Sequence, residues 1–243
     1  MENRPLVLGH RGASQACPEN TLAAFAQARA FGADGVELDV RRTSDDQLVV
    51  HHDPHVADFG LILHQPFAAL RAAHPEIPTL AEALAACAGM IVNVEIKCLP
   101  WEPDPDTPDR AVVRAVVDLV RAGASVPVAD VIVSSFELAA VDACRAFAPE
   151  LATGWLTSGP DIAATAPLVA ERGHAWLNPD RAAARRAGPD DIAAAHAAGV
   201  RVNVWTVDEP GDITALAKVG VDAIITNVPD VALAVLQRGR ATE

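Results

Sequence analysis

Basic residues are scarce in this chain. It has 19 Lys and Arg against 32 Asp and Glu, which gives a formal net charge of −13. A protein that neutralises nucleic-acid phosphates needs a basic face, so this balance argues against a nucleic-acid partner and favours a small ligand. The same negative field repels an anionic ligand at long range. Any phosphate site must therefore supply its own local positive charge or a cation.

Long apolar runs are also missing. Although 51% of the residues are hydrophobic, no run reaches the roughly 18 apolar residues that a membrane span requires. The first residues do not follow the charged-then-apolar layout of a secretory signal, because Gly9-His10-Arg11 interrupts the apolar stretch Leu6-Val7-Leu8. We therefore expect a soluble, cytoplasmic protein with no stable membrane association.

The four cysteines, Cys17, Cys87, Cys98 and Cys144, are far apart and form neither a CxxC pair nor a compact disulfide pattern. Reduced thiols are expected. A glycine-rich nucleotide turn is missing as well, because residues 9–13 read GHRGA and not GxGxxG. This argues against the nucleotide-binding version of a doubly wound open sheet. At 243 residues, one domain with a large core is expected.

What the chain does contain is a recurring pattern of short Val/Ile/Leu runs, each followed by an Ala-rich stretch with helical spacing. The pattern predicts alternating strands and helices. The predicted strands are residues 6–10, 35–40, 48–52, 91–97, 131–136, 152–157, 175–178, 201–207 and 223–226. The predicted helices are residues 20–31, 79–88, 108–122, 137–147, 161–172, 190–198, 210–219 and 229–238.

Nine strands are one more than a (β/α)8 barrel needs. Only seven residues separate Val40 from Leu48, whereas a parallel crossover needs about a dozen, so residues 48–52 are predicted to run antiparallel as a return strand. Turn residues at the centre of the connector predict a hairpin. Eight parallel strands and eight helices then predict an α/β fold, a (β/α)8 TIM barrel over residues 1–243. Residues 53–78 are predicted to be a short insertion over the barrel mouth, and a doubly wound sheet is the alternative fold.

Polar side chains gather where the predicted strands end, which is where (β/α)8 enzymes carry their functional groups. Glu37 and Asp39 are two apart on one strand, so they project to the same side. Two converging carboxylates in a partly dry site repel each other unless a positive charge lies between them, and a hard divalent cation with oxygen ligands meets this need. Glu95 on the next strand is the predicted third ligand. The alternative is that these acids only form salt bridges with basic neighbours: Arg11, Arg41 and Lys97.

Two basic residues are predicted to border the acidic group. Lys97 lies on the same face as Glu95 by the two-residue period, and Arg11 follows His10 at the end of the first strand. A guanidinium binds two phosphate oxygens at once, and an ammonium acts as a compact point charge. We therefore predict that Arg11 and Lys97 bind a substrate phosphate.

Two histidines are predicted to reach the same place. A hairpin turn centred within residues 44–46 sets His52 across from Glu37 or Asp39, and His10 ends the first strand. Two imidazoles beside one anionic centre suit phosphodiester cleavage by general acid and general base. The sequence alone leaves open which histidine is the acid and which is the base.

Taken in order, these residues resemble the glycerophosphodiester phosphodiesterase family, whose pattern is His-Arg, then Glu-x-Asp, then His-Asp. The three parts stand here at residues 10–11, 37–39 and 52–53. Further matches cover nearly the whole chain: Gly9-His10-Arg11-Gly12, Pro18-Glu19-Asn20-Thr21, Val94-Glu95-Ile96-Lys97, Val133-Ser134-Ser135-Phe136, Val204-Trp205-Thr206-Val207 and residues 220–227.

The resemblance implies a barrel of the phospholipase C-like phosphodiesterase type. It implies one divalent cation, Mg2+ or Ca2+, held by Glu37, Asp39 and Glu95, and catalytic histidines at His10 and His52. The implied reaction is hydrolysis of a small glycerophosphodiester to glycerol 3-phosphate and an alcohol. The nucleophile is either water or the neighbouring glycerol hydroxyl of the substrate.

Three further residues are assigned to the substrate pocket: Glu19, Phe136 and Trp205. The ring of Trp205 would face glycerol or a choline-type ammonium, and core filling is the alternative for both aromatic residues. Asn227 departs from the family pattern, in which the last strand usually ends in Asp, and we expect this to alter contacts beneath the site. Head-group preference is left open, and the expected assembly is a monomer or a homodimer.

Two competing functions remain at this point. One keeps the site but takes a lysophospholipid at the membrane surface, although no basic amphipathic helix supports it. The other is a catalytically silent barrel that binds a metal or a phosphate as a sensor or scaffold, although every expected proton donor is present.

Overall fold

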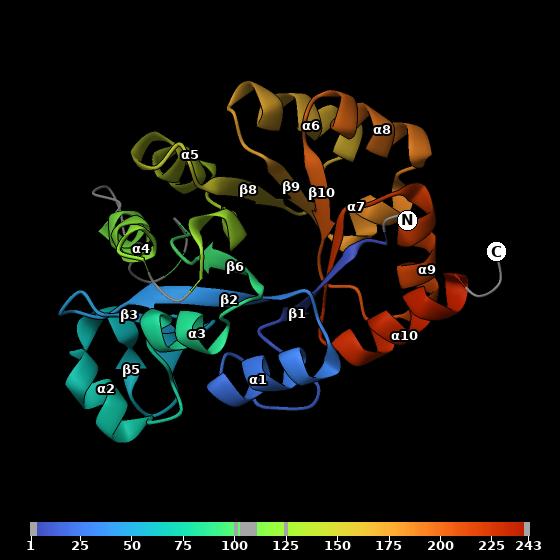
Figure 1. The fold of residues 1–243 in the computed structure, drawn as a ribbon. Helices are drawn as coiled ribbons and strands as arrows, with labels where there is room; N and C mark the ends of the chain where they lie inside the picture. The colour runs from blue at the N-terminus through green and yellow to red at the C-terminus, as the bar shows by residue number, and fades with distance from the viewer. Residues whose placement is uncertain (1–3, 100–101, 103–110, 124–125, 241–243) are drawn as a thin grey trace.

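Eight parallel strands form a closed barrel in the computed structural model, which describes residues 4–99, 102, 111–123 and 126–240. The barrel closes because β1 pairs in parallel with both β11 and β2, as Figure 1 shows. The strands are β1 (Leu6–His10), β2 (Gly35–Arg42), β6 (Ile91–Ile96), β7 (Val131–Ser135), β8 (Ala152–Thr157), β9 (Trp176–Pro179), β10 (Arg201–Val204) and β11 (Ala223–Thr226). The predicted (β/α)8 barrel is confirmed.

Helices surround the barrel on its outer side (Figure 1). Those that match the eight predicted helices are α1 (Leu22–Phe31), α3 (Leu80–Ala86), α4 (Ala111–Arg121), α5 (Leu138–Phe147), α6 (Ile162–Glu171), α8 (Pro189–Ala197), α9 (Pro210–Val219) and α10 (Pro229–Arg240). The predicted start of α4, residues 108–110, lies outside the described residues. Local signals set several ends: the Thr21 side chain accepts a hydrogen bond from the Ala24 amide at the start of α1, and Gly32 ends that helix with a φ of 85°.

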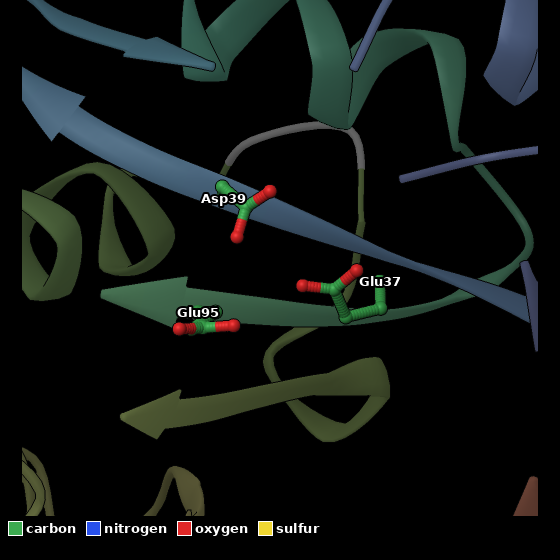
Figure 2. A group of neighbouring side chains, drawn as sticks. All are labelled: Glu37, Asp39 and Glu95. Carbon is green, nitrogen blue, oxygen red and sulfur yellow. The ribbon is translucent and has the colours of Figure 1, made fainter. Parts of the chain in front are cut away.

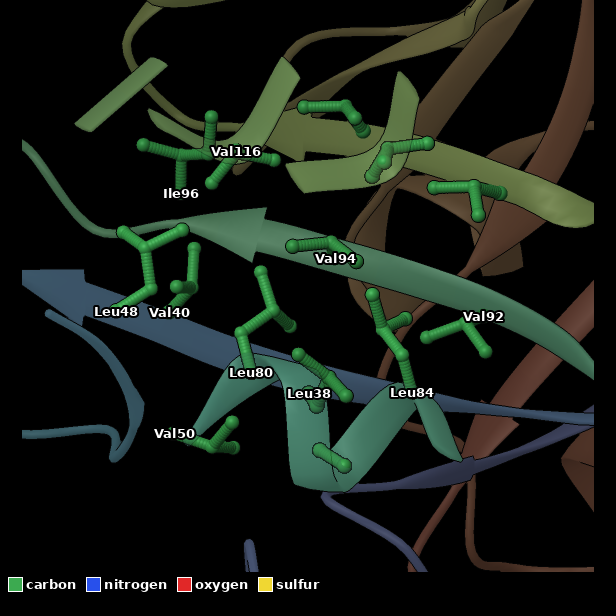
Figure 3. Packing of buried hydrophobic residues seen from close by; sticks show 14 of the residues in the cluster. Leu38, Val40, Leu48, Val50, Leu80, Leu84, Val92, Val94, Ile96 and Val116 are labelled. Carbon is green, nitrogen blue, oxygen red and sulfur yellow. The ribbon is translucent and has the colours of Figure 1, made fainter. Parts of the chain in front are cut away.

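The two-residue period of β2 separates core from site. Leu38 and Val40 point outward, are fully buried and pack against Leu80 and Leu84 of α3, as Figure 3 shows. The opposite face of β2 carries Glu37, which points into the barrel. The apolar contact fixes the strand, and the fixed strand aims its carboxylates inward.

The barrel interior changes from apolar to polar. An apolar cluster that includes Leu8, Ile132, Trp176 and Ile225 fills one part of it. Between this cluster and the acidic residues the interior is filled by four fully buried polar side chains, which are Asn93, Ser134, Asn178 and Asn203. In the register of the strands Asn93 lies beside Glu37 and Ser134 lies beside Glu95.

The predicted return strand is present, but its register is one residue away from the expected one. Strand β3 (Leu48–Val50) pairs antiparallel with β2, with Val40 opposite Val50. The Thr43 amide donates to the Gln47 carbonyl, so the hairpin loop has only three residues, 44–46. The last of them, Asp46, has a φ of 65°. The prediction that His52 lies directly opposite Glu37 or Asp39 is therefore wrong. The His51 amide bonds the Asp39 carbonyl instead, and His52 follows the end of β3.

The segment at residues 53–78 has more regular structure than its sequence pattern predicted. It contains β4 (His55–Val56), β5 (Gly60–Leu61), the 3-10 helix η1 (Ile62–His64) and α2 (Phe67–Ala73). Its small apolar cluster includes Val49 of β3, and Figure 1 shows α2 and β5 beside β3.

Two other short elements were not predicted: the 3-10 helix η2 (Val128–Asp130) and helix α7 (Arg181–Arg186). Such short pieces carry too few apolar positions to give a periodic signal. None of the helices in the described part of the chain combines the length and apolar character needed to cross a bilayer.

Candidate active site

Three acidic side chains from two neighbouring strands meet inside the barrel. Glu37 and Asp39 belong to β2 and Glu95 belongs to β6, as Figure 2 shows. One carboxylate oxygen from each lies within 4.8 Å of the other two. Their exposed fractions are 3%, 1% and 7%. The predicted grouping of the three acids is therefore present.

The two predicted phosphate-binding cations lie against these acids. The Lys97 Nζ is 3.0 Å from Asp39 Oδ1 and 2.6 Å from Glu95 Oε1. The Arg11 Nε is 3.2 Å from Asp39 Oδ2, and the Arg11 backbone N–H donates to Glu37 Oε2. Arg11 and Lys97 therefore form ion pairs with the acids, and both residues also line the cleft above the acids.

Burial and charge push the three carboxyl groups in opposite directions. Burial raises the pKa of Glu37 to about 8, and the charge of Asp39 adds to this shift. Burial likewise raises the pKa of Glu95 to about 8, against the lowering effect of Lys97. For Asp39, burial acts upward, but Lys97 and Arg11 together outweigh it and lower the pKa to about 2. Two of the three carboxyls thus lack enough positive charge nearby to ionise easily.

The donor set fits a hard divalent cation. All three groups offer carboxylate oxygens, which Mg2+ and Ca2+ prefer over the nitrogen and sulfur donors that suit zinc. Glu37 Oε1 is buried and has no hydrogen-bond partner among the described residues, and a buried polar atom of that kind needs one. A cation at this point would supply the positive charge that Glu37 and Glu95 lack.

The two histidines flank the acidic group. His10 Nε2 lies 4.0 Å from Glu37 Oε2, while its Nδ1 is 2.7 Å from Asn227 Oδ1. His52 Nδ1 is 2.7 Å from Asp53 Oδ1, so an ionised Asp53 fixes the proton on Nδ1 and leaves Nε2 for a ligand. Burial lowers the pKa of both histidines, with help from Arg11 at His10 and from Lys97 at His52.

A cleft opens above these groups. Among its lining residues are the predicted site residues His10, Arg11, Glu37, His52, Glu95, Lys97, Phe136 and Trp205. The two aromatic rings form one wall, with centroids 5.2 Å apart in an edge-to-face arrangement. Asp39, which is 1% exposed, is not among the lining residues. Glu19 binds Arg11 Nη1 at 2.7 Å and lines a neighbouring hollow, not this cleft.

Several residues that support the site were not predicted to do so. Among the described residues Arg41 pairs with Glu102 and not with the three site acids, and its Nε and Nη2 both donate to the His52 backbone carbonyl. Asn20 donates to Asp39 Oδ2. Asn227 was expected to act beneath the site, but it contacts His10 directly. Arg41 shares the inward face of β2 by the two-residue period, so a sequence signal for it existed.

The acidic centre and the two adjacent histidines lie at the carboxyl ends of the barrel strands. Enzymes with an α/β barrel carry their active sites at this end. The model of the glycerophosphoryl diester phosphodiesterase family matches residues 10–231. The chain belongs to this family. Its membership confirms the resemblance seen in the sequence and the expected class of enzyme, a phosphodiesterase.

Individual relatives agree with this assignment. A glycerophosphodiester phosphodiesterase of Caldanaerobacter subterraneus subsp. tengcongensis is 30% identical over 97% of this chain and 99% of its own length. A glycerophosphodiester phosphodiesterase structure from Thermotoga maritima superposes with a TM-score of 0.79 at 27% identity, covering 98% of this chain and 100% of that one. An Oleispira antarctica phosphodiesterase, solved with the product sn-glycerol-3-phosphate, gives 0.82 at 26% identity and covers 96% of this chain and 97% of that one.

Proposed function

We propose that this protein hydrolyses small glycerophosphodiesters to glycerol 3-phosphate and an alcohol, using one divalent cation, Mg2+ or Ca2+, and two histidines. The observation that carries this proposal is a single cleft lined by His10, His52, Glu37, Glu95 and Lys97. The product bound to the Oleispira antarctica relative supports the same substrate class.

The cation would be held by Glu37, Asp39 and Glu95, and when bound it would supply positive charge to a phosphate oxygen. Arg11 and Lys97 neutralise the remaining phosphate charge. The Lys97 ammonium has three N–H donors, and two face Asp39 and Glu95, which leaves one for the ligand. Because Arg11 and Lys97 are already fixed by ion pairs, they need not reorganise when charge develops on the phosphate.

The histidines would move the protons. Each presents Nε2 toward the cleft while its Nδ1 is bonded to a neighbour, Asn227 for His10 and Asp53 for His52. One imidazole would take a proton from the attacking hydroxyl, and the other would give a proton to the departing alkoxide. Such a pair contributes roughly 10²- to 10⁴-fold to the rate.

The remaining proposals concern the protein as a whole. We propose that residues 1–243 form one domain, with residues 53–78 as its insertion. We propose that the protein acts in the cytoplasm, without nucleic acid or stable membrane association, as a monomer or homodimer. The ring wall of Phe136 and Trp205 would contact the glycerol or the head group, because both rings line the cleft.

The deciding experiment measures glycerol 3-phosphate release from a panel of head groups, with and without a chelator. Activity should disappear on chelation and return with Mg2+ or Ca2+. His10→Ala and His52→Ala should each lower kcat by at least about 100-fold, whereas the exposed His55 offers a control, His55→Ala, that keeps full activity. Full activity after exhaustive metal removal would contradict the role of the carboxylates.

The same panel separates the two competing functions. Faster cleavage of a lysophospholipid than of glycerophosphocholine would move the substrate to the membrane surface. Binding of phosphate without release of product from any head group would indicate a silent barrel. The proposal requires turnover of the small diesters.

A further inference from the structure

Asn227 connects His10 to a second polar group. It follows β11 and lies beside the end of β1, and its Oδ1 is 2.7 Å from His10 Nδ1. The Ser14 hydroxyl donates to the same Oδ1 at 2.8 Å. On its other side, Asn227 Nδ2 donates to Asp208 Oδ2 at 2.7 Å. The amide therefore bridges a predicted catalytic imidazole and a carboxylate that does not line the cleft.

Asp208 is held firmly in this position. Its Oδ1 accepts from the Thr226 hydroxyl at 3.0 Å and from the Asn227 backbone N–H at 2.8 Å. An ionised carboxylate can only accept hydrogen bonds. The amide group of Asn227 must therefore turn its NH2 toward Asp208 and its carbonyl oxygen toward His10.

The direction of this bond decides where the His10 proton is. A carbonyl oxygen only accepts, so His10 Nδ1 must donate and must carry a hydrogen. In the neutral ring the other nitrogen, Nε2, then holds a lone pair. This Nε2 is the atom that lies on the cleft side, 4.0 Å from Glu37 Oε2.

We propose that Asp208 is a positioning residue that acts through Asn227 to lock neutral His10 in the Nδ1–H tautomer. The inference rests on the proposed function only for its effect on turnover. The chemistry of this position suits Asn better than Asp. Two carboxylates with oxygens about 2.7 Å apart would repel each other, whereas an amide offers a donor to Asp208 and an acceptor to His10.

Exchanging the two polar groups gives a sharp test. In Asp208→Asn, the carbonyl of the new amide still accepts from Thr226 and the Asn227 backbone, so its NH2 faces the Asn227 side chain. Asn227 must then rotate to offer its oxygen, and its NH2 turns toward His10. His10 Nδ1 becomes an acceptor, and the proton moves to Nε2. The double variant Asp208→Asn with Asn227→Asp restores an acceptor beside His10 and should restore the Nδ1–H tautomer.

The tautomer is read directly by nitrogen-15 NMR of the full-length, Mg2+-saturated protein labelled at histidine, at about pH 8.5, where an imidazole of ordinary pKa is neutral. The His10 signals are assigned by their loss in His10→Gln. Steady-state kinetics follow on the same samples. The control is Asp212→Asn, which removes another buried carboxylate, bound to Arg181, from the neighbouring helix α9.

We expect the Nδ1–H pattern in the wild type, in Asp212→Asn and in the double variant, and the Nε2–H pattern in Asp208→Asn. Turnover of Asp208→Asn should fall by at least about 10-fold, the usual effect of a lost supporting partner, and should recover in the double variant. An Nε2–H wild type, or an Asp208→Asn protein that keeps Nδ1–H, would overturn the proposal even if kcat falls. A wild type without turnover would instead count against the proposed function, since the NMR result does not depend on activity.

Discussion

Raising the pH of the metal-free protein from about 6.5 to about 8.5 should lower its free energy of unfolding. Glu37 and Glu95 have pKa values raised to about 8 in the fold, from an ordinary value of 4.5. A carboxyl with a raised pKa stabilises the folded state while it is protonated, and this stabilisation is lost as the pH rises through the folded value. For one such group the linkage relation gives a loss of about 2 kcal/mol over this interval. The two together should give about 2 to 4 kcal/mol, because ionising one opposes ionising the other.

Other titrating groups set the limits of this window. The pKa values of His10, His52 and His174 are lowered in the fold from 6.5, so their contribution rises as the pH passes that value and adds at most about 0.4 kcal/mol each above it. Burial raises the pKa values of the Cys87 and Cys144 thiols to about 12 from 9.0. Their contribution falls only above the window. Across the window the loss of stability from the two carboxyls exceeds the gain from the histidines.

Urea unfolding followed by circular dichroism, with a chelator present, measures this effect. The control is the double variant Glu37→Gln with Glu95→Gln, which keeps the shape of both side chains and removes their titration. Its stability should not fall over the window. Adding Mg2+ or Ca2+ to the wild type should restore the lost stability. A free cation concentration of 100 times the Kd should add about 2.7 kcal/mol. A fixed cation concentration should add more at the higher pH, where the ligands are ionised. A metal-free protein whose stability is constant or rises from pH 6.5 to 8.5 would refute the reasoning.

Two further predictions test the support of the site. Leu38→Ala removes a fully buried side chain between β2 and α3 and should lower the unfolding free energy by about 2–5 kcal/mol, while Leu22→Ala, at a residue 41% exposed, should change it by less than about 0.5 kcal/mol. Arg41→Lys leaves at most one of the two hydrogen bonds to the His52 carbonyl. It should lower kcat about 10-fold, while the cation affinity measured by calorimetry should not change. An unaltered kcat would show that Arg41 does not position His52.

The local pattern of the sequence was enough to predict the barrel and the acidic group. Apolar residues at Leu38 and Val40 alternate with acids at Glu37 and Asp39, and a strand must place such alternating residues on opposite faces. The seven-residue gap after Val40 excluded a parallel crossover to the next strand. These inferences depend only on spacing along the chain, which is why the structure confirms them.

Tertiary structure decided what spacing could not. The hairpin register depends on its loop conformation, which contacts with a distant segment hold: the Ser44 amide donates to the Gln65 carbonyl, and Asp45 accepts from the Phe67 amide. The link between Asp208 and His10 likewise joins the end of the first strand to the ends of the last two strands, which are far from it in the sequence. The sequence determined which side chains face the barrel interior, because strand geometry repeats every two residues. The hydrogen bonds among those side chains were decided only when the barrel closed, because closure brings the first and last strands together.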